Sequence, residues 1–144
     1  MDKTEVLDLY AGTGALGLEA VSRGSSAACF VESNPGVLNV CRDNARSLGV
    51  ENSCRFERMD VIRYLQSESS RTFTLIFADP PYRDPAVPDM VAGAMTRLAP
   101  GGLLVVEHVR GLTFPDVSEQ VSTRKYGRTA VTIFTRSESD DGTN

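Results

Sequence analysis

The fold is decided by the stretch Val6-Leu7-Asp8-Leu9-Tyr10-Ala11-Gly12-Thr13-Gly14-Ala15-Leu16-Gly17, in which an apolar run passes into a glycine-rich loop and then a helical pattern. Glycines let the backbone turn tightly and approach a ligand at a helix N-terminus. Gly12-x-Gly14-x-x-Gly17 also matches the dinucleotide-binding fingerprint. Glu32 ends the next apolar run 20 positions after Gly12, where an acidic residue holds a ribose hydroxyl. The loop therefore indicates a nucleoside cofactor, and a nicotinamide-dependent oxidoreductase fits it equally well.

Further apolar runs along the chain predict a mostly parallel sheet. They cover residues 28–31, 73–78 and 103–106, and helical patterns separate them, which is typical of a sheet with helices on both faces. Two later strand-like stretches, Val121 to Tyr126 and Thr129 to Thr135, are separated only by Gly127-Arg128, which predicts an antiparallel hairpin. The expected class is an α/β, Rossmann-like fold with a C-terminal antiparallel hairpin.

The helices have recognisable ends. One is expected from about Ala15 to Arg23, a short one after Asp60, and another from about Pro88 to Leu98. A further helix begins at Pro35 after the capping residue Asn34 and stops at Gly49. Its expected sheet-facing stripe consists of Val37, Cys41, Ala45 and Leu48.

Length and composition indicate one globular domain. The chain has 144 residues, of which 41% are hydrophobic and 24% charged. We expect one folded domain over residues 1–136 and a disordered acidic tail over 137–144, which has no apolar residue. Neither a signal peptide nor an apolar stretch of roughly 20 residues is present, so we expect a cytoplasmic protein without a membrane partner. Three dispersed cysteines and one histidine predict no metal site.

The motif Asp79-Pro80-Pro81-Tyr82 distinguishes between the possible enzyme classes. It follows an apolar strand and is expected beside the glycine loop, where the strand order of the sheet reverses. An exocyclic amine of a nucleobase is a poor nucleophile, and the Asp79 carboxylate and Pro80 carbonyl can accept its two hydrogens and orient it. The prolines fix the backbone, and Tyr82 offers a face on which a flipped base can stack. These four residues are the predicted catalytic residues of a methyltransferase.

Together with Leu98-Ala99-Pro100-Gly101-Gly102 and Val106-Glu107-His108, these motifs resemble the bacterial 16S ribosomal RNA guanine-N2 methyltransferases of the small subunit, the RNA small-subunit methyltransferase D family. The resemblance runs to Arg136 and implies S-adenosylmethionine as the cofactor and ribosomal RNA or the small ribosomal subunit as the partner of a monomeric enzyme. It implies that Asp79 to Tyr82 hold the target guanine. The implied cofactor-binding residues are Asp8, Tyr10, Ala11, Gly12, Thr13, Gly14, Gly17, Glu32, Ser33, Asp60, Val61 and Asp79.

The start of the chain and its charge depart from this family. Members begin several dozen residues earlier with a basic segment, whereas this chain has a net charge of −4. We therefore expect a truncated form, and a cofactor-binding module with weak catalysis is one alternative. An adenine-N6 methyltransferase is another, since adenine presents an exocyclic amine to the same acceptors. Arg83 is a candidate contact to phosphate or base, and a basic edge can form from Arg110, Arg124, Lys125 and Arg128. We expect a structural role for His108.

Overall fold

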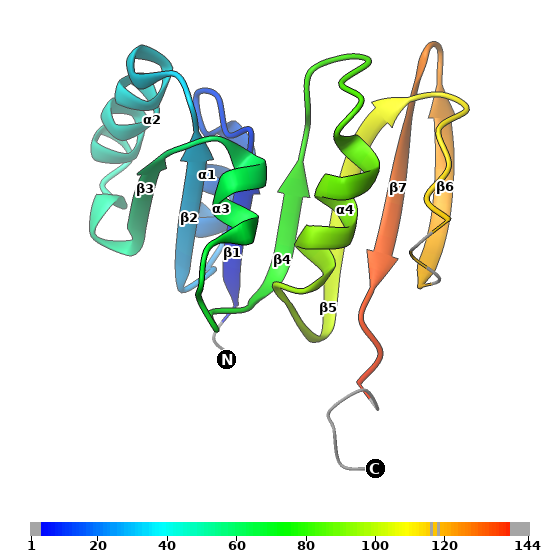
Figure 1. Ribbon diagram of the computed structural model, residues 1–144. Helices are drawn as coiled ribbons and strands as arrows, with labels where there is room; N and C mark the ends of the chain where they lie inside the picture. The colour runs from blue at the N-terminus through cyan, green and yellow to red at the C-terminus, as the bar shows by residue number, and fades with distance from the viewer. Residues whose placement is uncertain (1–3, 116, 118, 139–144) are drawn as a thin grey trace.

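The computed structural model describes residues 4–115, 117 and 119–138, which form seven strands and four α-helices (Figure 1). The strands are β1 (Glu5–Leu9), β2 (Ala27–Glu32), β3 (Cys54–Arg58), β4 (Phe73–Ala78), β5 (Leu98–Val109), β6 (Gln120–Tyr126) and β7 (Thr129–Thr135). The helices are α1 (Ala15–Ser22), α2 (Pro35–Ser47), α3 (Val61–Gln66) and α4 (Val87–Met95), and a single 3₁₀ turn, Glu51–Ser53, precedes β3.

One sheet contains all seven strands in the order β3-β2-β1-β4-β5-β7-β6. The first five strands in this order are parallel, and β7 is antiparallel to both β5 and β6. The mostly parallel sheet and the C-terminal hairpin are confirmed. After β1 the chain winds outward to β2 and β3 and then returns to β4, so the order reverses between β1 and β4. Ligands of such sheets bind outside the carboxyl ends of the strands at this point.

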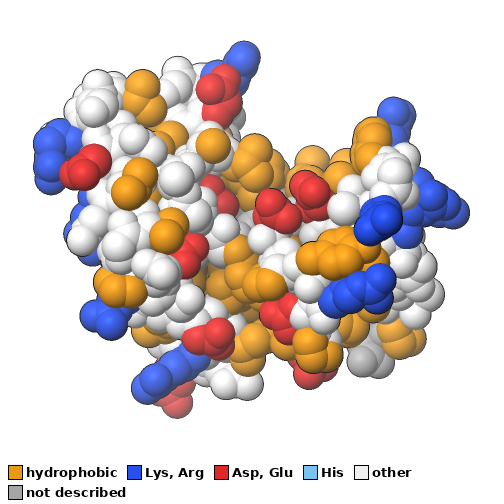
Figure 2. All heavy atoms as spheres, turned by 90° about the horizontal axis from the view of Figure 1, so that it is seen from above, with side chains coloured by type: hydrophobic (Ala, Val, Ile, Leu, Met, Phe, Trp, Pro, Cys, Tyr) orange, Lys and Arg blue, Asp and Glu red, His pale blue; other side chains and the backbone are white. Residues whose placement is uncertain are grey.

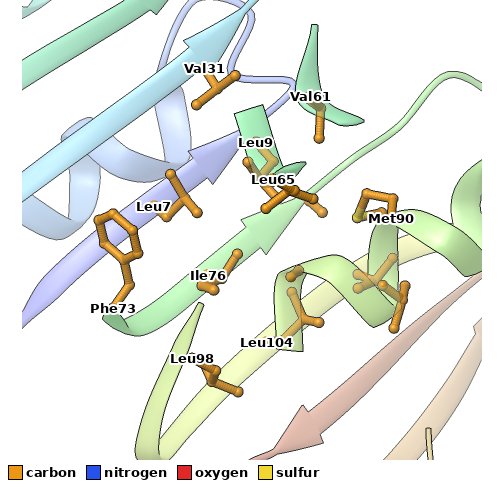
Figure 3. Packing of buried hydrophobic residues seen from close by; sticks show 14 of the residues in the cluster. Leu7, Leu9, Val31, Val61, Leu65, Phe73, Ile76, Met90, Leu98 and Leu104 are labelled. Carbon is orange, nitrogen blue, oxygen red and sulfur yellow. The ribbon is translucent and has the colours of Figure 1, made fainter. Parts of the chain in front are cut away.

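Helices cover the two faces of the sheet from opposite sides. Helices α3 and α4 pack in front of it in the view of Figure 1, on a large apolar cluster that includes Leu7, Ile76 and Leu104 (Figure 3). Helices α1 and α2 pack on the other face, on a smaller cluster built around Phe30. Asn34 caps α2 as expected, because its side-chain oxygen accepts a hydrogen bond from the Val37 N–H at 3.0 Å.

The structure corrects three local expectations. Helix α4 ends at Met95, and Leu98 already belongs to β5. In α2 the residues that face the sheet are Leu38, Cys41 and Ala45, whereas Leu48 follows the helix and is 56% exposed. Leu48 is the C-cap residue of α2, and Gly49, whose φ of +73° ends the helix, follows it. Strand β3 was not among the apolar runs, since Cys-Arg-Phe-Glu-Arg alternates at the sheet edge.

The domain bounds 1–136 stay a prediction, and residues 139–144 of the expected disordered tail lie outside the described residues. No helix within the described part of the chain is long and apolar enough to cross a membrane.

Candidate functional site

The carboxyl ends of β1, β2, β4 and β5 meet at one edge of the sheet. Leu9 of β1 pairs with Val31 of β2 and with Ala78 of β4, and Ala78 pairs with Val106 of β5. The residues that follow these four are Tyr10, Glu32, Asp79 and Glu107. The structure therefore brings the glycine loop, the acidic end of β2 and the Asp79-Pro80-Pro81-Tyr82 motif together, although they are far apart in the sequence.

Glu32 holds the glycine loop in place. Its carboxylate accepts a hydrogen bond from the Gly12 N–H at 2.9 Å and another from the Asn34 N–H at 3.0 Å. Gly12 has a φ of +59°, and a Cβ built there would meet only the Tyr10 carbonyl, at 4.0 Å. The backbone at Gly12 is thus open to a ligand, and the half-buried Glu32 carboxylate retains lone pairs for a hydroxyl group.

Gly14 and Gly17 have a different role, since both are buried. A Cβ at Gly14 would lie 2.5 Å from the Cys41 Sγ, and a Cβ at Gly17 would lie 2.5 Å from the Phe30 ring. These two glycines let α1 approach β2 and α2 closely. Gly12 is therefore the member of the fingerprint that leaves space in front of the backbone.

Asp8 lies beneath the loop, with a side chain that is only 3% exposed. Its Oδ2 accepts a hydrogen bond from the Gly17 N–H at 3.0 Å. Burial raises the pKa of Asp8 to about 7; the bond from Gly17 opposes this shift, and the nearby Asp79 carboxylate adds to it. The structure places the predicted cofactor residue Asp8 behind the loop, where it joins β1 to α1.

We expect Asp8→Asn to change how stability depends on pH. The raised pKa means that the folded chain binds a proton more tightly than the unfolded chain, so stability falls as pH rises from about 4 to 7. At ~1.4 kcal/mol per pKa unit, ionised Asp8 destabilises the fold by a few kcal/mol at high pH. Urea unfolding at pH 5 and pH 8 should therefore show Asp8→Asn gaining stability relative to the natural chain at pH 8. An equal difference at both pH values would contradict this.

The adenine end of the expected cofactor site is formed at α3. Asp60 caps this helix, because its Oδ2 accepts a hydrogen bond from the Arg63 N–H at 3.2 Å, and Val61 is buried in the core. Tyr10, in the left-handed region with φ 58°, is half-buried, and its pKa is raised by burial and by the carboxylates of Asp84 and Asp60. Tyr10, Asp60 and Asp84 come after the ends of β1, β3 and β4, respectively, at the carboxyl edge of the sheet.

The predicted residues Ala11, Thr13 and Ser33 complete this region. Thr13 and Ser33 are exposed and Ala11 is half-buried. The Ala11 N–H donates to the Val31 carbonyl at 3.0 Å, and the Thr13 carbonyl accepts from the Asn44 side chain at 3.0 Å. The loop is thus tied to both β2 and α2. Open backbone at Gly12, a carboxylate at the end of β2 and a helix N-terminus at Asp60 fit a nucleoside cofactor.

A pocket of about 370 Å³ lies beside the Asp79-Pro80-Pro81-Tyr82 motif. The motif and the turn after it form one wall, and the ends of β5 and β7 form the other. The lining residues are Asp79, Pro80, Pro81, Tyr82, Arg83, Asp84, Pro85, Val87, Glu107, His108, Val109, Leu112 and Thr129. A planar purine base is smaller than this space, and the predicted catalytic residues all line it.

The motif itself turns sharply after Asp79. The Asp84 N–H donates to the Pro81 carbonyl at 3.1 Å, and Arg83 has a φ of +65°, which is strained for a residue with a side chain. The Arg83 guanidinium lies 5.2 Å from the centre of the Tyr82 ring, which is 51% exposed. Burial raises the pKa of Asp79. The turn thus presents an aromatic face, a cation and a partly desolvated carboxylate to the pocket.

His108 has a structural role, as expected. It is 6% exposed, and its ring nitrogens bond to the Val109 carbonyl at 2.8 Å and the Thr132 hydroxyl at 2.7 Å. Its ring also meets the Phe114 ring edge-on, with centroids 5.1 Å apart. No signal in the sequence indicated that Leu112 and Thr129 line the pocket. Thr129 begins β7, and only the strand order shows that β7 reaches this site.

The basic edge forms at the β6–β7 turn. The Arg110 side chain donates to the Gly127 carbonyl at 3.0 Å, and the Arg110 N–H donates to the Arg128 carbonyl at 3.0 Å. Arg124, Lys125 and Arg128 are exposed. Figure 2, which looks down on the carboxyl edge, shows Lys and Arg side chains gathered on the β6–β7 side and acidic side chains near the centre. The four residues lie on β6, after β5 and in the β6–β7 turn, and the turn adjoins Thr129 of the pocket.

No group of three or more His, Cys, Asp or Glu residues that could hold a metal ion occurs in the described part of the chain. That the protein works without a metal stays a prediction.

The strand order, the glycine loop after β1 and the motif after β4 define the fold of the class I S-adenosylmethionine-dependent methyltransferases, which confirms the expected fold class. The chain belongs to the family described as Conserved hypothetical protein 95, whose model matches residues 1–135.

Two relatives illustrate this membership, and one solved structure illustrates the shared fold. "Putative rRNA methyltransferase YlbH" of Bacillus subtilis (strain 168) is 34% identical over 135 residues, which cover 89% of this chain and 73% of YlbH. Ribosomal RNA small subunit methyltransferase D of Escherichia coli (strain K12) is 33% identical over 79 residues, or 55% of this chain and 39% of that protein. The structure of an RNA methyltransferase from Salinibacter ruber in complex with S-adenosyl-L-homocysteine has a TM-score of 0.71 at 20% identity, covering 94% of this chain and 82% of that one.

Proposed function

We propose that this chain is an S-adenosylmethionine-dependent methyltransferase that modifies the exocyclic N2 amine of a guanine in 16S ribosomal RNA. The observation that carries the proposal is the pocket beside Asp79-Pro80-Pro81-Tyr82, one strand away from the open backbone at Gly12. The names of the relatives YlbH and small subunit methyltransferase D support RNA as the substrate class. The site of methylation rests on the family resemblance.

The cofactor would be held by the Gly12 backbone, the Glu32 carboxylate and the region around Asp60. When bound, S-adenosylmethionine supplies a methyl group on a positively charged sulfur. The Salinibacter ruber relative, crystallised with S-adenosyl-L-homocysteine, supports this choice. The Glu32 carboxylate, already fixed by two backbone N–H groups, is positioned to accept hydrogen bonds from ribose hydroxyls.

The chain's own residues prepare the amine. The Asp79 carboxylate and the Pro80 carbonyl accept its two hydrogens, which favours a pyramidal nitrogen with its lone pair aimed at the methyl donor. The nitrogen gains a methyl group and loses one proton, which the Asp79 carboxylate can accept. The exposed Tyr82 ring provides a stacking surface for the base outside its helix. In this proposal the enzyme works in the cytoplasm, as a monomer and without a metal.

Calorimetric titration separates this proposal from an oxidoreductase with the same glycine fingerprint. We expect S-adenosylhomocysteine to bind and NAD to bind at least about 100-fold more weakly, a difference of ~2.7 kcal/mol. Tight binding of NAD with none of S-adenosylhomocysteine would overturn the methyltransferase assignment.

The basic edge should contribute to RNA affinity through phosphate contacts. We expect Arg110→Gln combined with Arg128→Gln to weaken RNA binding at low salt and to reduce the slope of log affinity against log salt by about 1 to 2, because each lost phosphate contact removes roughly 0.7 to 0.9. Arg23→Gln combined with Arg46→Gln is the matched control, since these exposed arginines lie at the end of α1 and in α2. An equal slope in both double variants would exclude this surface.

A further inference from the structure

Glu107 lies next to Asp79 at the end of the neighbouring strand. Val106 pairs with Ala78 in the parallel register of β4 and β5, and Glu107 and Asp79 are the residues that follow them. Glu107 lies within β5 and Asp79 follows β4 directly, so the register of the two strands sets these residues side by side. Both residues line the pocket. A base held by Asp79 through one amine is therefore within reach of a second carboxylate.

The Glu107 side chain is available for such a contact. It is exposed, and it makes no hydrogen bond or ion pair with the residues that the structure describes. Other polar groups of that wall are already engaged. The two His108 ring nitrogens bond to Val109 and Thr132, and the Thr129 hydroxyl donates to the Tyr126 carbonyl at 3.0 Å. The Glu107 carboxylate, a hydrogen-bond acceptor, is thus available on the β5–β7 wall of the pocket.

Guanine and adenine differ in what they present to two neighbouring acceptors. Guanine carries an N1–H donor beside its N2 amine, so its edge offers donors to both carboxylates. Adenine carries an acceptor at N1 beside its N6 amine, and a lone pair would face the Glu107 carboxylate there. Two acceptors that face each other in a binding site leave both groups without a hydrogen bond. The loss of binding free energy is then much larger than that caused by a small mismatch in shape.

We propose that Glu107 selects guanine by accepting a hydrogen bond from N1–H while Asp79 and Pro80 hold the N2 amine. The inference rests on the proposed function, since it assigns a specificity-determining residue to the same pocket. The Asp79-Pro80-Pro81-Tyr82 motif can accept the exocyclic amine of either guanine or adenine. Glu107 would distinguish the two bases at N1.

The test compares guanine with 2-aminopurine, which keeps the 2-amine but has an acceptor at N1. RNA oligonucleotides that contain a single guanine or a single 2-aminopurine are methylated with labelled cofactor, and the ratio of their kcat/KM values is measured. We expect the natural chain to prefer guanine by at least about 100-fold. Glu107→Gln should reduce this preference to about 10-fold or less, because the glutamine amide can donate to N1 of 2-aminopurine. Glu107→Asp, which keeps a carboxylate, should retain the preference.

Glu68→Gln is the matched control, since Glu68 is exposed and lies outside the pocket; it should keep the natural ratio. An unchanged ratio in Glu107→Gln, with guanine still methylated and S-adenosylhomocysteine still bound, overturns the inference alone. A natural chain that binds S-adenosylhomocysteine but methylates no guanine overturns the proposed function as well. Methylation of adenine in place of guanine contradicts both.

Discussion

Asp79→Ala is expected to lower kcat for methyl transfer by about 10²–10³-fold, the usual effect of removing one well-placed group that stabilises a transition state. Asp79 lines the pocket at the end of β4, and with its carboxylate removed only the Pro80 carbonyl is left to orient the amine. Single-turnover incorporation of labelled methyl groups measures the effect. Asp43→Ala, an exposed change on α2, is the control. A rate within threefold of the natural chain would contradict the role of Asp79.

Protonation of Asp79 should also affect how methyl-transfer activity depends on pH. Burial raises its pKa above the ordinary value of 3.8, so the natural chain should lose activity on acidification at a higher pH than an exposed aspartate would. Asp79→Asn keeps an oxygen acceptor and removes the titrating group. The variant should therefore be slower at neutral pH and lack this acid limb.

Gly17→Ala is expected to destabilise the fold by about 3 kcal/mol or more, at the upper end of the cost of overpacking a core. The added Cβ would lie 2.5 and 2.9 Å from two carbons of the Phe30 ring and 3.1 Å from the Asp8 carboxylate. Phe30 is fully buried and stacked on Phe56 at 5.5 Å, so its ring has little room to move. Helix α1 must shift, and the bond from the Gly17 N–H to Asp8 must lengthen.

Gly36→Ala provides the comparison for this variant. Gly36 lies near the start of α2, and a Cβ there would meet only the Asn34 oxygen at an ordinary 3.4 Å. Alanine should be neutral or stabilise by up to ~1 kcal/mol at such a helical position. Urea unfolding at one pH measures both changes. A loss below ~0.5 kcal/mol for Gly17→Ala would show that α1 does not depend on this close approach.

The fold was predictable because strong local signals agree with one another. The apolar runs of β1, β2 and β4, the Asn34-Pro35 helix start and the Gly127-Arg128 turn each specify an element, and each forms as expected. Strand β3 lies at the edge of the sheet and pairs only with β2. Three of its five residues are charged, so it shows no apolar run in the sequence. The end of α4 was misplaced since Leu98 continues an apolar pattern that β5 also uses.

The sequence indicated which segments meet at the candidate site, but it did not indicate the contacts that each residue makes there. Asp79 lies beside the Gly12 loop because β4 is the neighbour of β1 in the sheet. Asp8 bonds to Gly17 inside the fold, and of the three fingerprint glycines Gly12 is the one with open space in front of it. Both facts depend on helix packing, which the sequence pattern does not reveal. The position of Glu107 beside Asp79 required the register of β4 and β5.

The most direct test of the central claim is mass-spectrometric analysis of nucleosides from 16S ribosomal RNA that the purified chain has methylated. We predict N2-methylguanine at a single position, formed with S-adenosylmethionine and absent when Asp79→Ala replaces the natural chain. If the methyl group is found on N6 of adenine instead, or if the RNA gains no methyl group although S-adenosylhomocysteine binds, the account is contradicted.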